Sequence, residues 1–220
     1  MNLVQFLRDK GQTVHAIDLD PMNHTLAEYP GVHAKPVDLL VAGHTGLKGQ
    51  EIDAMAQSML TEDASFVIDN GSSGFVQMGG YLAETEFAEL LADRDRDLLV
   101  HAVIAGGDMM SQCILGLNTI LTSFPASVQV VVWLNEHSGP TEIDGMRFQD
   151  MKIYRDNATR FAGLVNMPAL KPLFLQDFNE MLRRRLTYAE AINSPDFYIM
   201  NRRRLVMIRR QIWQQLEAIL

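Results

Sequence analysis

Short apolar runs that alternate with helical patterns are the feature that most constrains the fold of this chain. The four strongest runs are apolar almost throughout and lie at residues 13–18, 65–69, 97–105 and 128–135. Strands of this kind are typical of parallel sheets, because both sides of each strand are buried when helices cover the two faces. The sequence therefore predicts an α/β fold, with a mostly parallel sheet flanked by helices on both faces.

Weaker patterns fill the rest of the chain. Two more strands are expected, a short one at 37–42 and a late edge strand at 162–170. Helices are expected over five segments: 1–11, 51–60, 81–93, 108–123 and 145–157. The chain after residue 170 is predicted to be helical. We therefore expect one α/β domain over residues 1–170, and a C-terminal helical extension over residues 171–220 that packs on the same domain.

The last helix, expected over 197–220, is both amphipathic and basic. Its apolar stripe consists of Leu205, Ile208, Ile212 and Leu216, and four arginines lie largely off that stripe: Arg202, Arg203, Arg209 and Arg210. From residue 177 onward the chain carries +3, whereas the preceding part carries −11 of the total −8. Two interpretations remain open, a docking helix with a solvated basic face or a surface for nucleic acid or an acidic partner.

Composition limits the compartment and the partners. A net charge of −8 argues against bulk electrostatic binding to nucleic acid or to an anionic membrane. Cys113 is the only cysteine, which excludes an intrachain disulfide and fits a reducing, cytoplasmic setting. No apolar run reaches the roughly 18 residues that a membrane helix requires, so no membrane insertion is expected.

Polar or small residues follow each of the four strong strands. They are Asp18 and Asp20, Asp69 and Asn70, Gly106 and Gly107, and Asn135. Ligands of open α/β sheets bind at the carboxyl ends of the strands, and a buried strand that ends in Asp commonly holds Mg²⁺ beside a nucleotide phosphate. Any one aspartate alone would be read as a helix cap or a turn residue. The whole set favours a ligand-binding rim.

Other catalytic patterns are missing from the sequence. The segment "GSSG" is followed by Phe75 and so lacks the spacing of a nucleophile elbow. The six histidines show no spacing typical of a zinc site, and no G-x-G-x-x-G occurs. These absences argue against a serine hydrolase, a zinc enzyme and a dehydrogenase.

Several segments resemble a known family. "GQTVHAIDLDPMNHTL", "SFVIDNGSSGFV" and "VVVWLN" resemble, in order, the strand after the phosphate-loop helix, the Walker B strand and the later Asn-bearing strand of ParA/MinD-type P-loop ATPases. "VHAVIAGG", "VVWLNEHSGP" and "RRRLVMIRRQIWQQL" more narrowly resemble TraL-type conjugal-transfer proteins of plasmids. The likeness runs along nearly the whole chain.

This resemblance implies a P-loop NTPase fold that uses ATP and Mg²⁺, with specific roles for four residues. Asp20 is expected to polarise the attacking water, Asp18 to support the Mg²⁺ shell, and Asp69 to hold Mg²⁺ through a water. Asn135 is expected near the adenine, where its amide can donate and accept. The implied protein is an ATP-driven homodimer that regulates the conjugation machinery or a DNA-processing partner.

The chain departs from the family at the phosphate loop. No G-x-x-x-x-G-K-[ST] occurs, and "GHTGLKG" at 43–49 has the wrong spacing. The family is expected to open with a strand and this loop, yet Met1 lies within the helix that should follow them. We therefore expect a late start, or else a degenerate paralogue, with weak or absent ATP binding. A lost central strand would leave unpaired sheet edges.

Two other functions stay open beside the nucleotide-dependent regulator. The chain could be a non-catalytic interaction protein that presents its arginine-rich C-terminal helix to a partner or to DNA. It could also be a different α/β enzyme that uses the same rim for another phosphorylated ligand.

Overall fold

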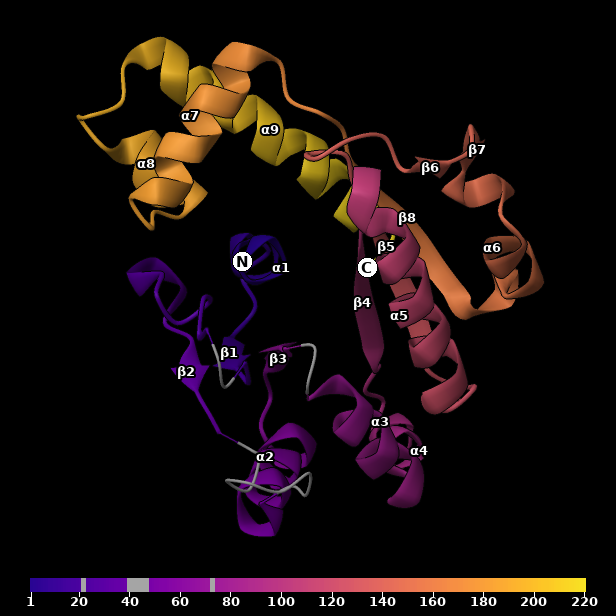
Figure 1. Cartoon of the computed structure of the whole chain (residues 1–220). Coiled ribbons are helices and arrows are strands. Elements are labelled where there is room, and N and C mark those ends of the chain that lie inside the picture. The colour runs from indigo at the N-terminus through magenta and orange to yellow at the C-terminus, as the bar shows by residue number, and fades with distance from the viewer. Residues whose placement is uncertain (21–22, 39–47, 72–73) are drawn as a thin grey trace. The chain divides into compact units, whose positions relative to one another are not determined.

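The computed structural model describes residues 1–20, 23–38, 48–71 and 74–220 and has an α/β architecture (Figure 1). Its helices are α1 (Asn2–Asp9), α2 (Gly49–Thr61), α3 (Phe75–Glu84), α4 (Phe87–Ala92), α5 (Met110–Ser123), α6 (Lys152–Asp156), α7 (Pro172–Arg183), α8 (Tyr188–Asn193) and α9 (Ile199–Glu217). Its strands are β1 (Val14–Asp18), β2 (Lys35–Pro36), β3 (Ser65–Asp69), β4 (Leu99–Ala105), β5 (Gln129–Asn135), β6 (Glu142–Ile143), β7 (Met146–Arg147) and β8 (Phe161–Met167).

The chain divides into two compact units. The first unit combines Met1–Met78 with Pro172–Arg209, and the second combines Gly79–Lys171 with Arg210–Leu220. Each unit contains one three-stranded parallel sheet, with the strand orders β2-β1-β3 and β4-β5-β8. The expected parallel pairing with covering helices is confirmed. The units do not coincide with the predicted ranges 1–170 and 171–220.

The first sheet is centred on β1. Its register with β3 runs without a break from Val14 opposite Ser65 to Asp18 opposite Asp69. On one face, β1 packs with α1 in a core of apolar residues: Val4, Val14, Ala16, Leu26, Tyr29 and Val32. Figure 1 shows α1 and α2 on opposite sides of this sheet. Both strands therefore end at the same level, which places their last residues side by side.

The second sheet is covered by α5 and α6 on one face and by the end of α9 on the other. Ala102, Ile104, Val130, Val132 and Leu134 form the strand side of the first of these cores, with Met110, Leu117 and Leu121 of α5 packed on them. On the other face, an added Cβ at Gly163 of β8 would lie 2.6 Å from Ile219, so a glycine lets the C-terminal segment approach the strand.

The outer edge of β8 is closed by a side chain of α9. Gln215 Oε1 accepts a hydrogen bond of 2.7 Å from the Asn166 N–H, and Gln215 Nε2 donates one of 3.0 Å to the Asn166 carbonyl. The amide of Gln215 thus satisfies the same two backbone groups that a neighbouring strand would satisfy.

The C-terminal helices α7 and α8 belong to the first unit because they bind its N-terminal elements. Gln5 of α1 accepts a buried hydrogen bond of 2.7 Å from the Tyr188 N–H at the start of α8. Arg185 pairs with Glu28 and lies 5.5 Å from the ring centroid of Tyr29. These contacts join segments that are more than 150 residues apart in sequence.

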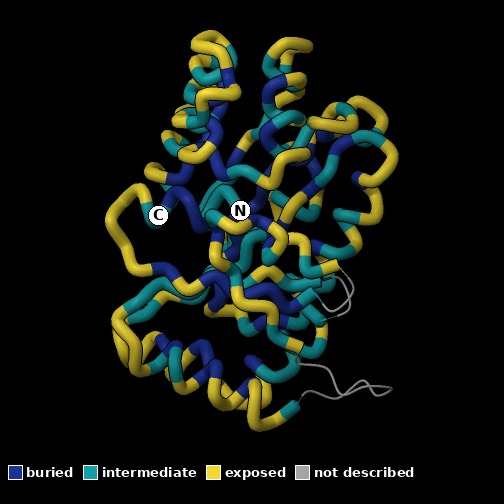
Figure 2. The backbone as a smooth tube through the Cα atoms, turned by 90° about the vertical axis from the view of Figure 1, so that its left-hand side faces the viewer, coloured by how far each residue is buried: buried dark blue, intermediate teal, exposed yellow. Residues whose placement is uncertain are grey.

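Most of the predicted elements are present. Helices are found at 1–11, 51–60 and 108–123, the late edge strand is β8, and the region after 170 is helical. All four residues of the predicted α9 stripe are at most 6% exposed: Leu205, Ile208, Ile212 and Leu216. Figure 2 shows buried and exposed positions alternating along the helices, as amphipathic helices require.

Two helix predictions were wrong. The expected helix 81–93 is interrupted, because Glu86 has φ of +51° and separates α3 from α4. The expected helix 145–157 begins instead with the β6–β7 hairpin, whose turn residues Asp144 and Gly145 have φ of +51° and +76°. An Asp-Gly pair is a strong hairpin signal, and it outweighed the weak helical periodicity around it.

The short strand expected at 37–42 lies earlier in the chain. Its described counterpart is β2 at Lys35–Pro36, which pairs in parallel with the end of β1. Residues 39–42 of that prediction, and residues 43–47 of "GHTGLKG", lie outside the described residues.

Arg160 fixes the loop between α5 and β5 in the second unit. Its guanidinium donates to three carbonyl oxygens, those of Leu121, Pro125 and Val128, at 3.3, 3.0 and 3.1 Å. Arg160→Met leaves these carbonyls without their donor and should lower the free energy of unfolding by about 2–3 kcal/mol. Urea unfolding followed by tryptophan fluorescence measures this loss.

A matched control is available in the same unit. Arg147 is also an arginine, its side chain is 72% exposed, and its ion pair with Asp150 lies on the surface. Arg147→Met should change the stability by less than about 0.5 kcal/mol. Equal effects of the two substitutions would contradict the role given to Arg160. Trp133 and Trp213 both lie in the second unit, so their fluorescence reports on it.

Candidate functional site

The carboxyl end of the first sheet brings together the aspartates predicted from the sequence. Asp18 ends β1 and Asp69 ends β3, and the two are register partners. The Leu19 N–H donates a hydrogen bond of 2.8 Å to the Asp69 carbonyl, which extends the pairing one residue beyond the strands. The segments that follow β1 and β3 therefore begin side by side at this edge of the sheet.

Asp18 organises the turn that follows β1. Its side chain is fully buried, at 0% exposure. One carboxylate oxygen accepts a hydrogen bond of 3.1 Å from the Asp20 N–H, and the other accepts one of 3.0 Å from the Ala27 N–H. His24 Nδ1 lies 3.7 Å from the first oxygen. Asp18 thus stabilises the backbone that carries Asp20, because a buried carboxylate requires such donors.

Asp20 lies against the segment that follows β3. An added Cβ at Gly71 would lie 2.9 Å from the carboxyl carbon of Asp20 and 3.0 Å from its Oδ1. Only glycine accommodates so close an approach without displacement. The two strand-end segments are therefore in contact, and three carboxylates, those of Asp18, Asp20 and Asp69, share one edge of the sheet.

The electrostatics of Asp69 reflect this crowding. The pKa of its carboxyl is raised above the ordinary value, chiefly because surrounding protein removes part of its hydration. The Met1 amino group opposes the rise, and the carboxylates of Asp18 and Asp20 add to it. Asp69 is nevertheless exposed, so solvent reaches its oxygens. A cation at this edge would relieve the repulsion among the three carboxylates.

The aspartates alone do not make a complete metal site. Within the described ranges, His, Cys, Asp and Glu side chains nowhere form a group of three or more that could hold a metal ion. Hard oxygen donors nevertheless suit Mg²⁺, which usually takes one or two carboxylates and completes its shell with water and phosphate. The carboxylate oxygens at this edge therefore suit a Mg²⁺ ion that takes its other ligands from water and phosphate.

Asn135 lies in the second unit, at the end of β5. Its Oδ1 accepts a hydrogen bond of 3.1 Å from the His137 N–H, and its carbonyl accepts one of 2.8 Å from the Gly106 N–H. The side chain therefore shapes the turn that follows the strand. The three aspartates belong to the first unit, and a common site with Asn135 remains a prediction.

The glycines predicted at the rim after β4 serve loop packing. An added Cβ at Gly106 would lie 2.1 Å from the Gly139 carbonyl, and one at Gly107 would lie 2.6 Å from the Ser138 carbonyl. Gly107 also has φ of +71°, a region that disfavours other residues. The loops after β4 and β5 thus interlock at this end of the second sheet.

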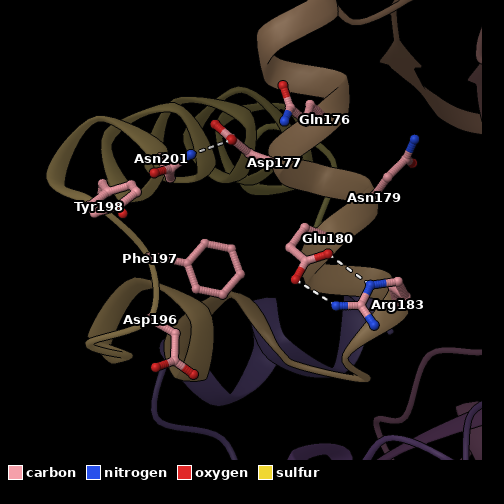
Figure 3. Close-up of a pocket in the computed structure, with 9 residues that line it drawn as sticks. All are labelled: Gln176, Asp177, Asn179, Glu180, Arg183, Asp196, Phe197, Tyr198 and Asn201. Atoms are coloured by element: carbon pink, nitrogen blue, oxygen red, sulfur yellow. Dashed lines mark hydrogen bonds and ion pairs between the residues drawn. The ribbon is translucent and has the colours of Figure 1, made fainter.

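A pocket that the sequence did not reveal lies between α7 and the turn into α9 (Figure 3). Its volume is about 410 Å³, and it is lined by Gln176, Asp177, Asn179, Glu180, Arg183, Asp196, Phe197, Tyr198 and Asn201. Figure 3 shows the Phe197 ring directed between the two segments. Hydrogen bonds from Arg183 and Arg184 lower the pKa of Glu180 to about 2, so its carboxylate stays charged. The sequence could not reveal this pocket through a single motif, because its polar residues come from separate elements.

Most of the C-terminal arginines have partners within the first unit. Arg183 and Arg184 bind Glu180, Arg184 also binds Asp196, Arg185 binds Glu28, Arg202 binds the Phe197 carbonyl, Arg204 binds Asp177, and Arg209 binds Asp9. Among the described residues, Arg203 and Arg210 are exposed without an ion pair or hydrogen bond. Of the four arginines of the predicted basic face, only Arg209 pairs with an acid of the chain, so that face is neutralised in small part only.

Not one helix in the part of the chain that the structure describes has both the length and the apolar character needed to span a bilayer.

Two proteins of Escherichia coli, each called Protein TraL, are similar to the chain. One is 33% identical over 217 residues, which cover 98% of this chain and 89% of that protein. The other is 33% identical over 216 residues, with the same two shares. No protein-family model and no solved structure matches the chain. The likeness extends over both compact units.

The structural role of Asp18 can be separated from any role in ligand binding. Asp18→Ala leaves the partly buried N–H groups of Asp20 and Ala27 without acceptors, so the free energy of unfolding should fall by about 2–3 kcal/mol. Asp18→Asn keeps one acceptor oxygen and should cost less. Urea unfolding followed by circular dichroism measures both, with exposed Asp63→Ala as the control. A loss no greater than that of Asp63→Ala would refute this role.

Proposed function

The chain belongs to the TraL family, and from this premise we propose that it acts in plasmid conjugal transfer as a nucleotide-dependent regulator. The proposal assigns the acidic part of a Mg²⁺–nucleotide site to the first unit. It takes the conjugation machinery or a DNA-processing protein as the partner, and an ATP-driven homodimer as the active form.

The observation that carries this proposal is the in-register end of β1 and β3. Two adjacent parallel strands deliver Asp18 and Asp69 to the carboxyl edge of a sheet, where ligands of α/β proteins bind. The contact of Gly71 with Asp20 adds a third carboxylate. Carboxylates that share one edge and repel one another favour a divalent cation there.

The proposed roles follow from the surroundings of each aspartate. Asp69, the exposed member, would orient a water in the Mg²⁺ shell. Asp18 would act from beneath the site by holding the turn that presents Asp20. Asp20 would accept a hydrogen bond from the attacking water and align it. Bound Mg²⁺ would neutralise charge on the phosphate oxygens. Asn135 would contact the base.

The sheet edges also support a P-loop architecture. The ParA/MinD-type ATPases, which the sequence resembles, have one further parallel strand, and it precedes the phosphate loop. In the described residues, β3 pairs only with β1, and β4 pairs only with β5. The β8 edge is closed by Gln215, but β4 is open and carries Val103 at 55% exposure. Each sheet therefore has an edge that can accept a parallel strand.

The nucleotide proposal predicts a difference between two lengths of the protein. The 220 residues contain no phosphate-loop motif, so they should bind Mg·ATP weakly or not at all. A chain extended upstream to an in-frame phosphate loop should bind with micromolar affinity, and Asp69→Ala in it should weaken that affinity about tenfold or more. Calorimetry with Mg·ATP measures both, with Asp63→Ala as the control.

Either of two results would overturn this proposal. One is micromolar Mg·ATP binding by residues 1–220, which would remove the need for a phosphate loop. The other is the absence of such a loop upstream together with no binding by any form of the protein. The strand-end carboxylates would then serve another ligand or only the fold.

One observation favours a second candidate, a non-catalytic interaction protein. Tyr198, Ile199 and Met200 are consecutive large side chains at the start of α9, and they are 84%, 81% and 60% exposed. An exposed apolar group of this kind marks a protein contact. Tyr198 also lines the pocket of Figure 3.

Conjugation frequency distinguishes the two candidates. A plasmid that carries Asp69→Ala should lose transfer if nucleotide regulation is the function. A plasmid that carries Tyr198→Ser with Ile199→Ser should lose transfer if α9 presents the chain to a partner. Full transfer with Asp69→Ala and loss with the α9 variant would establish the interaction protein in place of the regulator.

A further inference from the structure

The start of α9 and the turn before it carry an exposed group of large apolar side chains. Tyr198 and Ile199 are 84% and 81% exposed, more than any other large apolar side chain in the described residues, and Met200 follows at 60%. Three such side chains in succession leave much apolar area in water, and an exposed group of this kind marks a binding surface.

The fold holds this exposed group in place. Phe197, the residue before it, is only 4% exposed. The Arg184 guanidinium lies 5.4 Å from the centroid of the Phe197 ring, and Arg202 Nε donates a hydrogen bond of 2.7 Å to the Phe197 carbonyl. Because both the ring and the backbone of Phe197 are held, the three side chains that follow it project from a fixed point of the surface.

Opposite charges lie on the two sides of the apolar group. Asp196 precedes it in the turn, and its side chain is 66% exposed. One carboxylate oxygen of Asp196 accepts a hydrogen bond of 2.9 Å from Arg184, and a carboxylate can accept further donors. Arg203 follows the group, is exposed, and has no ion pair or hydrogen bond among the described residues. It comes four residues after Ile199 in the same helix, so the two share a face of α9.

The order of these residues makes the surface complementary to itself. We call it the α9 start surface, and it consists of Asp196, Tyr198, Ile199, Met200 and Arg203. Its acid comes three residues before Ile199, and its base comes three residues after Met200. A two-fold axis between Ile199 and Met200 brings Arg203 of a second copy opposite Asp196, and the reverse contact forms at the same time. The apolar side chains meet in the middle with charges at the rim, as in other protein interfaces.

We propose that the α9 start surface of one molecule binds the same surface of a second copy across a two-fold axis. This arrangement satisfies both charges, whereas a purely acidic or purely basic partner would face one of them with a like charge. The inference rests on the second candidate function, which takes the start of α9 as a contact surface, and it names the chain itself as the partner. It needs no nucleotide. A contact between identical surfaces is complete with two copies, so the assembly ends at a dimer.

The size of the α9 start surface sets the expected affinity. So few residues bury less than the roughly 800 Å² per partner of a standard stable interface, so the dimer should be weak. Its ion pairs lie at the rim, where salt screens them, and the association should therefore weaken as ionic strength rises. Sedimentation equilibrium of the full chain, from micromolar to submillimolar concentration at low salt, should show a mass that rises from 24.8 kDa toward twice that value and no further.

Charge substitutions test the two-fold arrangement. Arg203→Glu faces Asp196 of the other copy with a like charge on both sides of the axis, so it should weaken dimerisation about tenfold. Asp196→Arg should have the same effect, because it faces Arg203 with a like charge. An equimolar mixture of the two variants should recover the dimer, since each altered charge then meets its opposite. Both substitutions in one chain should also recover it, with the net charge unchanged.

A substitution that alters no charge tests the apolar centre. Ile199→Ser removes one large apolar side chain from each copy, so it should weaken dimerisation about tenfold or more. Ile199 is 81% exposed, so this change leaves the fold of the single chain intact, as circular dichroism should show. Dimerisation that Ile199→Ser leaves unchanged would contradict the proposal.

Arg210→Glu is the matched control for Arg203→Glu. Arg210 is also an exposed arginine of α9 without a partner in the described part of the chain, and it lies outside the α9 start surface. The substitution changes the net charge by the same amount and should leave dimerisation unchanged. Equal weakening by the two substitutions overturns the proposal. So does a mass of 24.8 kDa under all conditions, a mass that climbs beyond twice this value, or a mixture of the swapped variants that stays monomeric.

Self-association and plasmid transfer together separate this inference from the function on which it rests. If the chain stays monomeric while Tyr198→Ser with Ile199→Ser abolishes transfer, a different molecule covers the surface, so the inference is wrong and the interaction-protein function stands. If the chain dimerises as described while the same variant transfers normally, the inference stands and the interaction-protein function is wrong.

Discussion

The parallel pairing of β1 with β3 is the constraint on which the first unit depends. Its register is unbroken over five residues and ends with Asp18 opposite Asp69. Because Asp18 is buried there, the turn after β1 has to supply its backbone donors, and this turn places Asp20 against Gly71. A slip of one residue would turn the buried carboxylate to the other face of the sheet. The acidic edge is thus a consequence of strand register.

Long-range ion pairs hold the helical segment 172–209 to the first unit. Their acids come from distant places in the sequence, with Glu28 and Asp9 meeting arginines near the other end of the chain. Most of the positive charge that distinguishes the C-terminal region is therefore used inside the unit. What remains for an outside partner is the pair of exposed arginines Arg203 and Arg210, together with the exposed apolar start of α9.

The strands and the strand-end aspartates could be predicted because continuous apolar runs and their polar ends are local features. The buried stripe of α9 was equally visible from periodicity. The sequence did not predict the β6–β7 hairpin at Asp144–Gly145, because a weak helical pattern surrounds its turn signal. The pocket of Figure 3 and the pairing of the arginines could not be predicted, because they depend on which distant acids the fold brings near.

In the proposed site, Asp18, Asp20 and Asp69 together form one cation-binding edge. Titration of the isotope-labelled chain with Mn²⁺, followed by NMR line broadening of the backbone amides, tests it directly and detects even weak binding. The account predicts that broadening begins at the amides of 18–20 and 69–71 and is relieved by excess Mg²⁺. Broadening centred elsewhere, or equal broadening after Asp69→Ala, would contradict it.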